Sequence, residues 1–383
     1  YVDPGNVAAN LTAGARYGYL LVWVLVMANG MAVLVQYLSA KTGLVTGSSL
    51  PELLGARLGG RSRILYWLQA ELVAAATDLA EVLGGAIALQ ILFGVPLVLG
   101  GVIVGVVSML VLAIQTRRGQ RPFEYVVMGL LLVITIGFMA GLFVTGVSWS
   151  EAAAGLVPRF DGGQTVLLAA SMLGATVMPH AIYVHSALAR DRHGHRRDEL
   201  PRMLRATRWD VIASMVVAGA VNIAMLLLAA GNLQGVGGTD SIQGANEAIS
   251  IALGPTVGVL FGIGLLASGL ASTSVGCYAG ATIMSGLLRI RIPMLVRRAV
   301  TLVPALVILA LGVNPTWALV LSQVLLSLGI PFALIPLVRL SSDRALMGSH
   351  ANATPLRVAA WLVVGLIVLL NLALVVLSIV GLG

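Results

Sequence analysis

Apolar runs long enough to cross a lipid bilayer follow one another along almost the whole chain, and this feature limits the fold more than any other. Of the 383 residues, 58% are hydrophobic and 10% are charged, against about 25% charged in an average soluble domain. A helix needs about 20 apolar residues to span the hydrocarbon core, and lipid cannot satisfy exposed backbone polar groups. The sequence therefore predicts a polytopic, all-α membrane protein.

Loop signals divide these runs into eleven predicted helices. The first is a partial helix near 6–16, whose N-terminal half is expected to be missing because the chain starts with Tyr1 rather than Met. The other spans are predicted near 17–41, 64–92, 96–115, 122–147, 165–190, 208–231, 251–288, 293–312, 315–339 and 355–381. Since no extended soluble segment separates them, residues 1–383 form one predicted transmembrane domain.

Basic residues indicate the orientation of the chain. If the missing N-terminus is cytoplasmic, Arg16 and Arg159 are the two basic residues that fall outside, which leaves 21 of the 23 Lys and Arg residues on the inner side. Such an excess is typical of cytoplasmic loops, so we predict a multi-pass protein of the cytoplasmic (inner) membrane. The basic 190–208 loop is interpreted as a cytoplasmic linker, because basic residues spread over short loops do not form a nucleic-acid patch.

Two helix-breaking motifs occupy corresponding places in the two halves of the chain. DPGN, from Asp3 to Asn6, opens the first five helices, and Pro179 interrupts the span near 165–190 within GATVMPHAIYVH. Proline removes a backbone donor and frees carbonyl groups around Ala175; a simple kink is the alternative. An odd number of spans per half makes the halves inverted repeats, and paired broken helices in such repeats point to a transporter's substrate site.

The residues at the two breaks have the chemistry of a transition-metal site. The donors are a carboxylate, an amide oxygen, a backbone carbonyl and a thioether, from Asp3, Asn6, Ala175 and Met178 respectively. Oxygen donors alone suit Mg²⁺ or Ca²⁺, whereas an added sulfur favours Mn²⁺ or Fe²⁺. Packing is the alternative role of a methionine in a membrane helix. We predict that Met178 helps the site to reject alkaline-earth ions.

Three carboxylates lie on one face of the third predicted span. At about 100° per residue, Asp78 lies about 20° from Glu71 around the helix, and Glu81 lies about 80° from it. Carboxylates buried in a membrane are costly and either pair with cations or carry protons, and both alternatives stay open here. Arg297 and Arg298, at the start of the ninth helix, are the predicted partners, unless their side chains only reach toward the membrane surface.

His180 follows Met178 by two residues, about 200° around the helix, so the two side chains cannot readily bind one ion. Imidazole changes its charge near neutral pH. This property makes His180 a candidate proton relay, and a hydrogen-bonded interior histidine is the alternative interpretation.

The motifs DPGN and MPH, with the stretches QAELVAAATDLAE and LSQVLLSLGIPF, give the chain a likeness to a known family. Over its whole length the chain resembles the Nramp (natural resistance-associated macrophage protein) family of proton-coupled divalent-metal transporters, in particular its bacterial manganese and iron transporters. The resemblance implies a LeuT-like 5+5 inverted repeat. Residues 1–147 and 165–340 would be the two repeats, and 355–381 an additional eleventh helix.

The resemblance also implies roles for individual residues. The metal ligands would be Asp3, Asn6, Ala175 and Met178, joined by Gln323 in some conformations. The proton pathway would comprise Asp3, His180, Glu71, Asp78, Glu81, Arg297 and Arg298. A backbone carbonyl that the family supplies just before Tyr1 is absent from this chain. The intact Met178 argues against the family's magnesium-carrying branch, which lacks that methionine.

These features predict proton-coupled uptake of Mn²⁺ or Fe²⁺ by alternating access, with the metal bound between unwound helices 1 and 6. The partners implied are the metal ion, protons and the bilayer, with no prosthetic group, nucleic acid or obligate protein partner. One alternative is a LeuT-like proton-coupled carrier of an organic solute such as an amino acid, whose carboxylate Asp3 would repel. The other is an intramembrane enzyme, for which we find neither an HExxH motif nor a paired aspartyl site.

Overall fold

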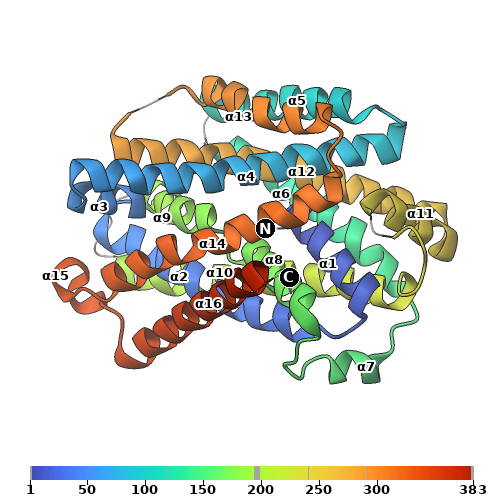
Figure 1. Ribbon diagram of the computed structural model, residues 1–383. Helices are drawn as coiled ribbons and strands as arrows, with labels where there is room; N and C mark the ends of the chain where they lie inside the picture. The colour runs from blue at the N-terminus through green and yellow to red at the C-terminus, as the bar shows by residue number, and fades with distance from the viewer. Residues whose placement is uncertain (1, 119, 194–198, 240, 291, 381–383) are drawn as a thin grey trace.

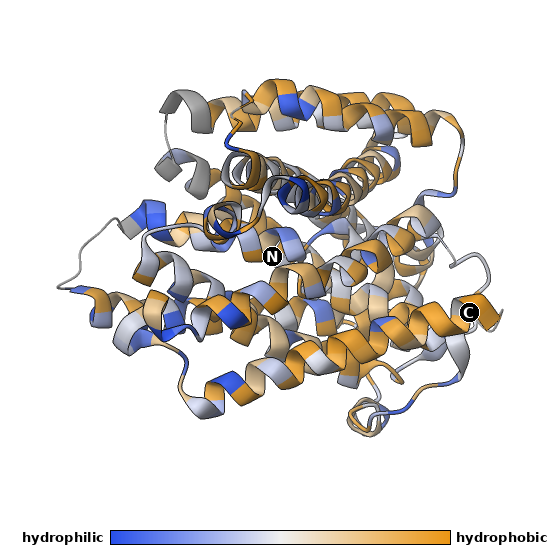
Figure 2. Cartoon of the chain, turned by 60° about the vertical axis from the view of Figure 1, so that its left-hand side comes forward, coloured by the Kyte–Doolittle hydropathy of each residue, from blue (hydrophilic) through white to orange (hydrophobic). Residues whose placement is uncertain are grey.

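The structure, a computed structural model, describes residues 2–118, 120–193, 199–239, 241–290 and 292–380. Its long helices lie side by side in layers (Figure 1). Within this part of the chain, nine helical segments are long and apolar enough to cross a membrane. Figure 2 shows hydrophobic residues along most of the length of the peripheral helices. The prediction of a polytopic, all-α membrane protein is confirmed.

The first half of the chain begins with a short, buried helix. Val2 is 3% exposed and Asp3 is 0% exposed, so the chain enters α1 from within the protein. The helices of this half are α1 (Pro4–Tyr17), α2 (Val22–Thr46), α3 (Leu50–Arg57), α4 (Gly60–Phe93), α5 (Leu97–Arg118), α6 (Gln120–Ala140), the 3₁₀ turn η1 (Gly141–Phe143) and α7 (Trp149–Ala154).

The second half begins with two helices in place of one. They are α8 (Gly162–Thr176) and α9 (Pro179–His193), and together they occupy the sixth predicted span. The chain continues through α10 (Leu200–Asn232), α11 (Ile242–Leu253), α12 (Pro255–Leu288), α13 (Met294–Ala310), α14 (Pro315–Ser341), α15 (Arg344–Met347), the 3₁₀ turn η3 (Gly348–His350) and α16 (Thr354–Val380).

The long helices α4 and α12 form the middle of the molecule. They pack along each other, and α5 and α13 cover them on one side (Figure 1). On the other side, α1 packs against α10, α8 and α14, while α16 lies outside α14 and α8. This arrangement places the start of α1 and the break between α8 and α9 in the interior.

Two predicted spans are wrong at one end, each for a local reason. The span 251–288 begins too early, because Gly254 ends α11 with a φ of +98° and Pro255 starts α12. A left-handed φ suits glycine, and proline is favoured at the first helical position. The span 122–147 continues too far, since α6 passes into η1 at Gly141 and the chain is no longer helical after Phe143.

The basic 190–208 segment is not a simple loop. α9 continues to His193 and α10 begins at Leu200, so most of the segment is helical, while residues 194–198 lie outside the described residues. Leu204, from this early part of α10, packs in a small cluster with Ala40 and Ala189. The short helices α3, α7, α11 and α15 were not predicted either, because none is long enough to register as a span.

Candidate functional site

The DPGN stretch folds as a capped helix start. Asp3 is the N-cap of α1, and its Oδ1 accepts hydrogen bonds from the backbone N–H and the Nδ2 of Asn6, each at 2.7 Å. Pro4 occupies the first helical turn, where an N–H would have no intrahelical partner in any case. The side chains of Asp3 and Asn6 are therefore fixed against each other.

The break between α8 and α9 supplies a free carbonyl group. Val177 and Met178 lie outside both helices. Pro179 has no N–H, so the carbonyl oxygen of Ala175, four residues earlier, loses its helical partner. Asn6 Nδ2 donates to this oxygen at 3.1 Å. The amide group of Asn6 thus joins the start of α1 to the α8–α9 break, although Asn6 and Ala175 are 169 residues apart in the sequence.

Gln323 reaches the same place from α14. A Cβ on Gly5 would lie 1.9 Å from Gln323 Nε2, so the approach requires glycine at this position. On the α8 side, a Cβ on Gly174 would lie 2.0 Å from the Gln323 carbonyl oxygen. The glycine of DPGN therefore serves close packing and does not loosen the chain, since α1 is helical from Pro4 onward. We call this place, formed by Asp3, Asn6, Ala175 and Gln323, the junction.

Three side-chain oxygens at the junction accept no hydrogen bond within the part of the chain that the structure describes. They are Asp3 Oδ2, Asn6 Oδ1 and Gln323 Oε1, and all three residues are 0% exposed. A buried polar atom without a partner costs about 1–3 kcal/mol. Three such acceptors in one place match the donor set that a metal cation requires.

Met178 lies in the same non-helical segment as the freed carbonyl. It is 2% exposed, and its backbone carbonyl accepts a hydrogen bond from Ile182 N at 3.3 Å, which starts α9. Among the described residues, no three His, Cys, Asp or Glu side chains form a metal-binding group. The junction differs from such groups because it has one carboxylate and otherwise neutral donors.

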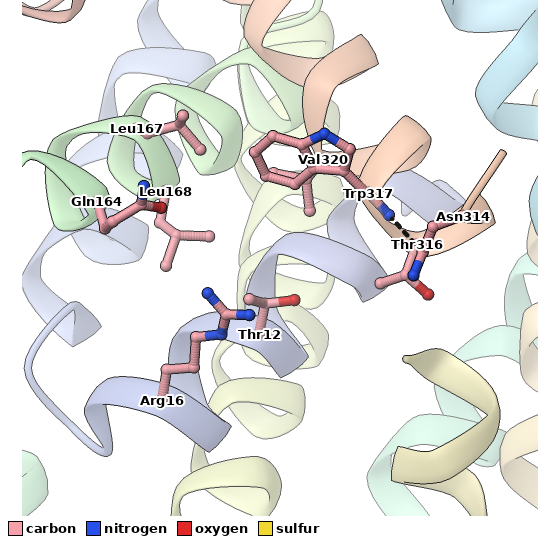
Figure 3. Close-up of a pocket in the computed structure, with 9 residues that line it drawn as sticks. All are labelled: Thr12, Arg16, Gln164, Leu167, Leu168, Asn314, Thr316, Trp317 and Val320. Atoms are coloured by element: carbon pink, nitrogen blue, oxygen red, sulfur yellow. Dashed lines mark hydrogen bonds between the residues drawn. The ribbon is translucent and has the colours of Figure 1, made fainter. Parts of the chain in front are cut away.

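A pocket of about 230 Å³ lies beside α1, away from Asp3 (Figure 3). It is lined by Thr12, Arg16, Gln164, Leu167, Leu168, Asn314, Thr316, Trp317 and Val320. Val320 lies about one helical turn before Gln323, and Leu168 about two turns before Ala175. Val320 and Leu168 are both buried, so α14 and α8 line the pocket with residues that come one to two turns before those at the junction.

A second polar cluster lies between α4 and α13, and we call it the carboxylate–arginine region (Glu71, Asp78, Glu81, Arg297 and Arg298). Arg297 binds Glu71 with two hydrogen bonds, from Nη1 to Oε2 at 3.1 Å and from Nη2 to Oε1 at 2.7 Å. Arg298 Nη1 lies 3.5 Å from Asp78 Oδ1, a looser ion pair. Both arginines are buried, at 5% and 0% exposed. They pair with carboxylates and do not reach toward the membrane surface.

The two inner carboxylates face the same point on α12. A Cβ on Gly276 would lie 3.0 Å from both carboxylate oxygens of Glu81 and 3.4 Å from Asp78 Oδ1. Arg298 is held from the other side, where its Nε donates to Ser108 Oγ on α5 at 2.9 Å. The shared helical face expected from the spacing of these acids is therefore present.

His180 is tied to the carboxylate helix. Its Nδ1 lies 3.1 Å from Thr77 Oγ1, and this hydroxyl also donates to the Val73 carbonyl at 3.0 Å. Because this hydroxyl already donates its one proton to Val73, the contact fits the tautomer of His180 that donates from Nδ1 to Thr77. Thr77 directly precedes Asp78. Neither Thr77 nor Ser108 was predicted, because a hydroxyl in an apolar helix gives no sign of a distant partner.

Ion pairs connect α3 and α9 at one end of the molecule, beside a cavity of about 290 Å³ that α12 also lines. Glu52 pairs with Arg190, which also contacts Asp191 Oδ1 at 2.7 Å, and the Tyr278 hydroxyl donates to Asp191 Oδ2 at 3.4 Å. Partial burial alone would raise the pKa of Glu52. Hydrogen bonds from Ser49 and Arg190 outweigh that effect and hold this pKa below its usual value.

Comparison with known proteins agrees with this architecture. The divalent metal cation transporter MntH of Mycobacterium tuberculosis is 60% identical over 384 residues, which cover 100% of this chain and 90% of the relative. The crystal structure of a manganese transporter from Eremococcus coleocola, in complex with an aromatic bis-isothiourea substituted compound, superposes with a TM-score of 0.87. It shares 30% identity and covers 97% of this chain and 83% of that one.

A more distant neighbour shares the fold. The crystal structure of MhsT in complex with L-phenylalanine has a TM-score of 0.57 at 15% identity, over 96% of this chain and 98% of the other. This likeness supports the LeuT-like architecture and says nothing of the cargo. The sequence profile described as natural resistance-associated macrophage protein-like matches residues 1–377. Together with the 60% identity to a relative that the chain covers almost completely, this match shows that the chain belongs to the Nramp family.

Proposed function

We propose that the protein carries divalent transition-metal ions, Mn²⁺ in particular and also Fe²⁺, inward across the cytoplasmic membrane together with protons. Its relatives support the cargo, since one is named a divalent metal cation transporter and another a manganese transporter. The observation that carries the proposal is the junction, where the start of α1, the α8–α9 break and α14 meet, and where three buried side-chain oxygens accept no hydrogen bond among the described residues.

The ion is the substrate, and its ligands would be Asp3, Asn6, the Ala175 carbonyl and Met178, with Gln323 joining them. Asn6 Nδ2 already donates to Asp3 and to Ala175, so the free Oδ1 of Asn6 is the atom left for the metal. Carboxylate, amide and carbonyl oxygens accept most divalent ions, whereas the thioether selects softer ones. Site selectivity would therefore come from a single sulfur.

The proton route would start at Asp3 and continue through the carboxylate–arginine region. Metal ligands must be deprotonated, so binding of the ion releases a proton that Asp3 holds. His180 is anchored to Thr77, the residue that precedes Asp78. Arg297 binds both oxygens of Glu71, so both acceptors of this carboxylate are already used. Asp78 and Glu81 are therefore the better candidates to carry the proton.

A cavity is present at each of two ends of the molecule. In the orientation with a cytoplasmic N-terminus, the pocket of Figure 3 would face outward and the cavity beside the Glu52–Arg190 pair would face the cytoplasm. Transport would follow when α1 and α8–α9 rock against α4 and α12, opening the inner contacts. The inside-negative membrane potential favours inward movement by about 2.3 kcal/mol per charge per 100 mV.

Uptake of Mn²⁺ into proteoliposomes at acidic external pH tests the proposal. We expect saturable uptake with internal acidification, and loss of both in Asp3→Ala. The matched control is Asp161→Asn, which changes an exposed carboxylate outside the junction. Binding of an amino acid with no response to Mn²⁺ would refute metal transport in favour of the organic-solute carrier. The enzyme alternative is not supported, since the relatives are transporters.

A further inference from the structure

α12 contributes no charged side chain, yet it lies against the carboxylate–arginine region. Its sequence between Pro255 and Leu288 contains no Asp, Glu, Lys or Arg. The backbone of α12 comes nearest to the charged side chains at two glycines, Gly276 and Gly280, and Cys277 between them is also within electrostatic reach of these charges. Such close contact between a helix backbone and charged groups leaves room for no side chain, so these positions control where the charges can lie.

Gly280 forms the surface against which Arg297 rests. A Cβ at this position would lie 2.1 Å from Arg297 Nη2 and 2.5 Å from both Cζ and Nε. The guanidinium cannot simply withdraw, because two of its nitrogens are bonded to Glu71. Any side chain at position 280 would therefore move Arg297 away from Glu71.

Gly276 has the same relation to the inner carboxylates, with less overlap. A Cβ there would lie 3.0 Å from each carboxylate oxygen of Glu81 and 3.4 Å from Asp78 Oδ1. With alanine at position 276, the two carboxylates would have to shift by a few tenths of an ångström, and no larger rearrangement would be required. Residues four apart lie on one helical face, so Gly276 and Gly280 form one continuous uncharged surface under the region.

We propose that Gly276 and Gly280 are positioning residues for proton transfer, because their missing side chains set the distances between the two arginines and the three carboxylates. This inference rests on the proposed function. Gly280 leaves room for Arg297 to bind both oxygens of Glu71, and the space over Gly276 lets Asp78 and Glu81 share a proton. Adding a side chain at position 276 or 280 would disturb the proton route and leave the junction unchanged.

The test measures Mn²⁺ uptake and acidification in the same proteoliposomes for three alanine variants. We expect the proton-to-metal ratio to fall about tenfold in Gly280→Ala and about threefold in Gly276→Ala, following the size of each overlap. The matched control is Gly264→Ala on the same helix, where the new Cβ would meet ordinary contacts at 3.5 and 3.6 Å. Its ratio should stay at the wild-type value, and Mn²⁺ binding should be unchanged in all three.

A rescue separates positioning from general packing. Combining Gly280→Ala with Arg297→Lys removes the guanidinium atoms that overlap and keeps a cation for Glu71, so part of the ratio should return. A folded Gly280→Ala protein with a wild-type ratio, or a double variant without any recovery, overturns the inference. If Gly280→Ala does not fold, Gly276→Ala decides alone. Absence of Mn²⁺ uptake in the wild type would instead refute the proposed function.

Discussion

The junction and the carboxylate–arginine region are both buried and polar, but they differ in charge. The junction joins the start of α1 to the α8–α9 break, and its oxygens belong to one carboxylate and to neutral groups. In the carboxylate–arginine region the helices are continuous and opposite charges face each other, with Arg297 bonded to both oxygens of Glu71. Asp78 Oδ1 and Arg298 Nη2 also make no hydrogen bond among the described residues, so the arginines compensate the charge without completing every hydrogen bond. The junction contains no cation of its own among these residues, and in our proposal the metal supplies it.

In the function that we propose, this difference separates the binding of a metal from the transfer of a proton. Three carboxylates and two arginines leave one net negative charge in the carboxylate–arginine region, which a single proton neutralises. A dication would give the region a net positive charge, and the two arginines would repel it. The comparison therefore predicts that substitutions in one place change metal specificity, and that substitutions in the other change proton movement or stability.

The largest effect is expected from Arg298→Gln. Arg298 is 0% exposed and pairs with Asp78, so the substitution leaves a buried carboxylate without its cation. We expect a loss of unfolding free energy of about 3 kcal/mol, measured by chemical denaturation in detergent. The double variant with Asp78→Asn should recover most of this loss. A double variant as unstable as the sum of its parts would show that the two residues are not coupled.

Glu81→Gln should alter proton movement and spare the metal. Since Glu81 is buried beside Gly276 and is not among the proposed metal donors, we expect near-normal Mn²⁺ uptake with acidification reduced about tenfold. Simultaneous records of internal pH and ⁵⁴Mn uptake provide the measurement. Glu247→Gln, which changes an exposed glutamate of α11, is the control. Undiminished acidification in Glu81→Gln would remove this residue from the route.

Met178→Ala should change selectivity more than capacity. The oxygen donors of the junction remain, so Mn²⁺ uptake should persist, while Ca²⁺ competition should strengthen about fivefold, or about 1 kcal/mol. Competition between ⁵⁴Mn and Ca²⁺ measures the change. Met172→Ala, which shortens another fully buried methionine of the α8–α9 region, controls for lost packing. Equal discrimination in wild type and Met178→Ala would contradict the role of the thioether.

Glu52→Gln should have the smallest effect. The Glu52–Arg190 pair is partly exposed, so its loss should weaken the contact between α3 and α9 by less than about 1 kcal/mol. The pKa of Glu52 is lowered, so the pair contributes fully above the usual glutamate pKa and is lost as the pH falls through the lowered value. Thiol labelling of Ala187→Cys, in a Cys277→Ser background, should accelerate in acid with Glu52 present. When the Glu52→Gln substitution is added, the labelling rate should not respond to pH over this range.

Much of the fold was predictable because apolar length and proline chemistry act locally. Pro179 alone predicts a freed carbonyl near Ala175, and the structure shows this carbonyl bonded to Asn6. The ends of spans were harder to predict. Gly254 ends α11 and Pro255 starts α12. The residues on both sides are apolar, so the hydropathy pattern does not reveal where one helix ends and the next begins.

The parts of the site that could not be predicted depend on partners far away in the sequence. In the sequence, Thr77 is one of several hydroxyl residues in apolar helices, and only the structure shows His180, 103 residues further on, beside it. Gly276 and Gly280 likewise resemble ordinary packing glycines in the sequence, and only the structure shows the charged side chains of α4 and α13 against them. The roles of the metal donors stay predictions that the transport experiments decide.

The double hydrogen bond of Asn6 has a kinetic consequence. Because this amide already binds Asp3 and the Ala175 carbonyl together, capturing an ion requires no search by loose chain segments for one another. The entropy of ordering was lost when the protein folded. The rate at which an ion binds should then depend on how fast it exchanges its hydration water. Dications that exchange water slowly would bind slowly, even where their size and charge suit the site.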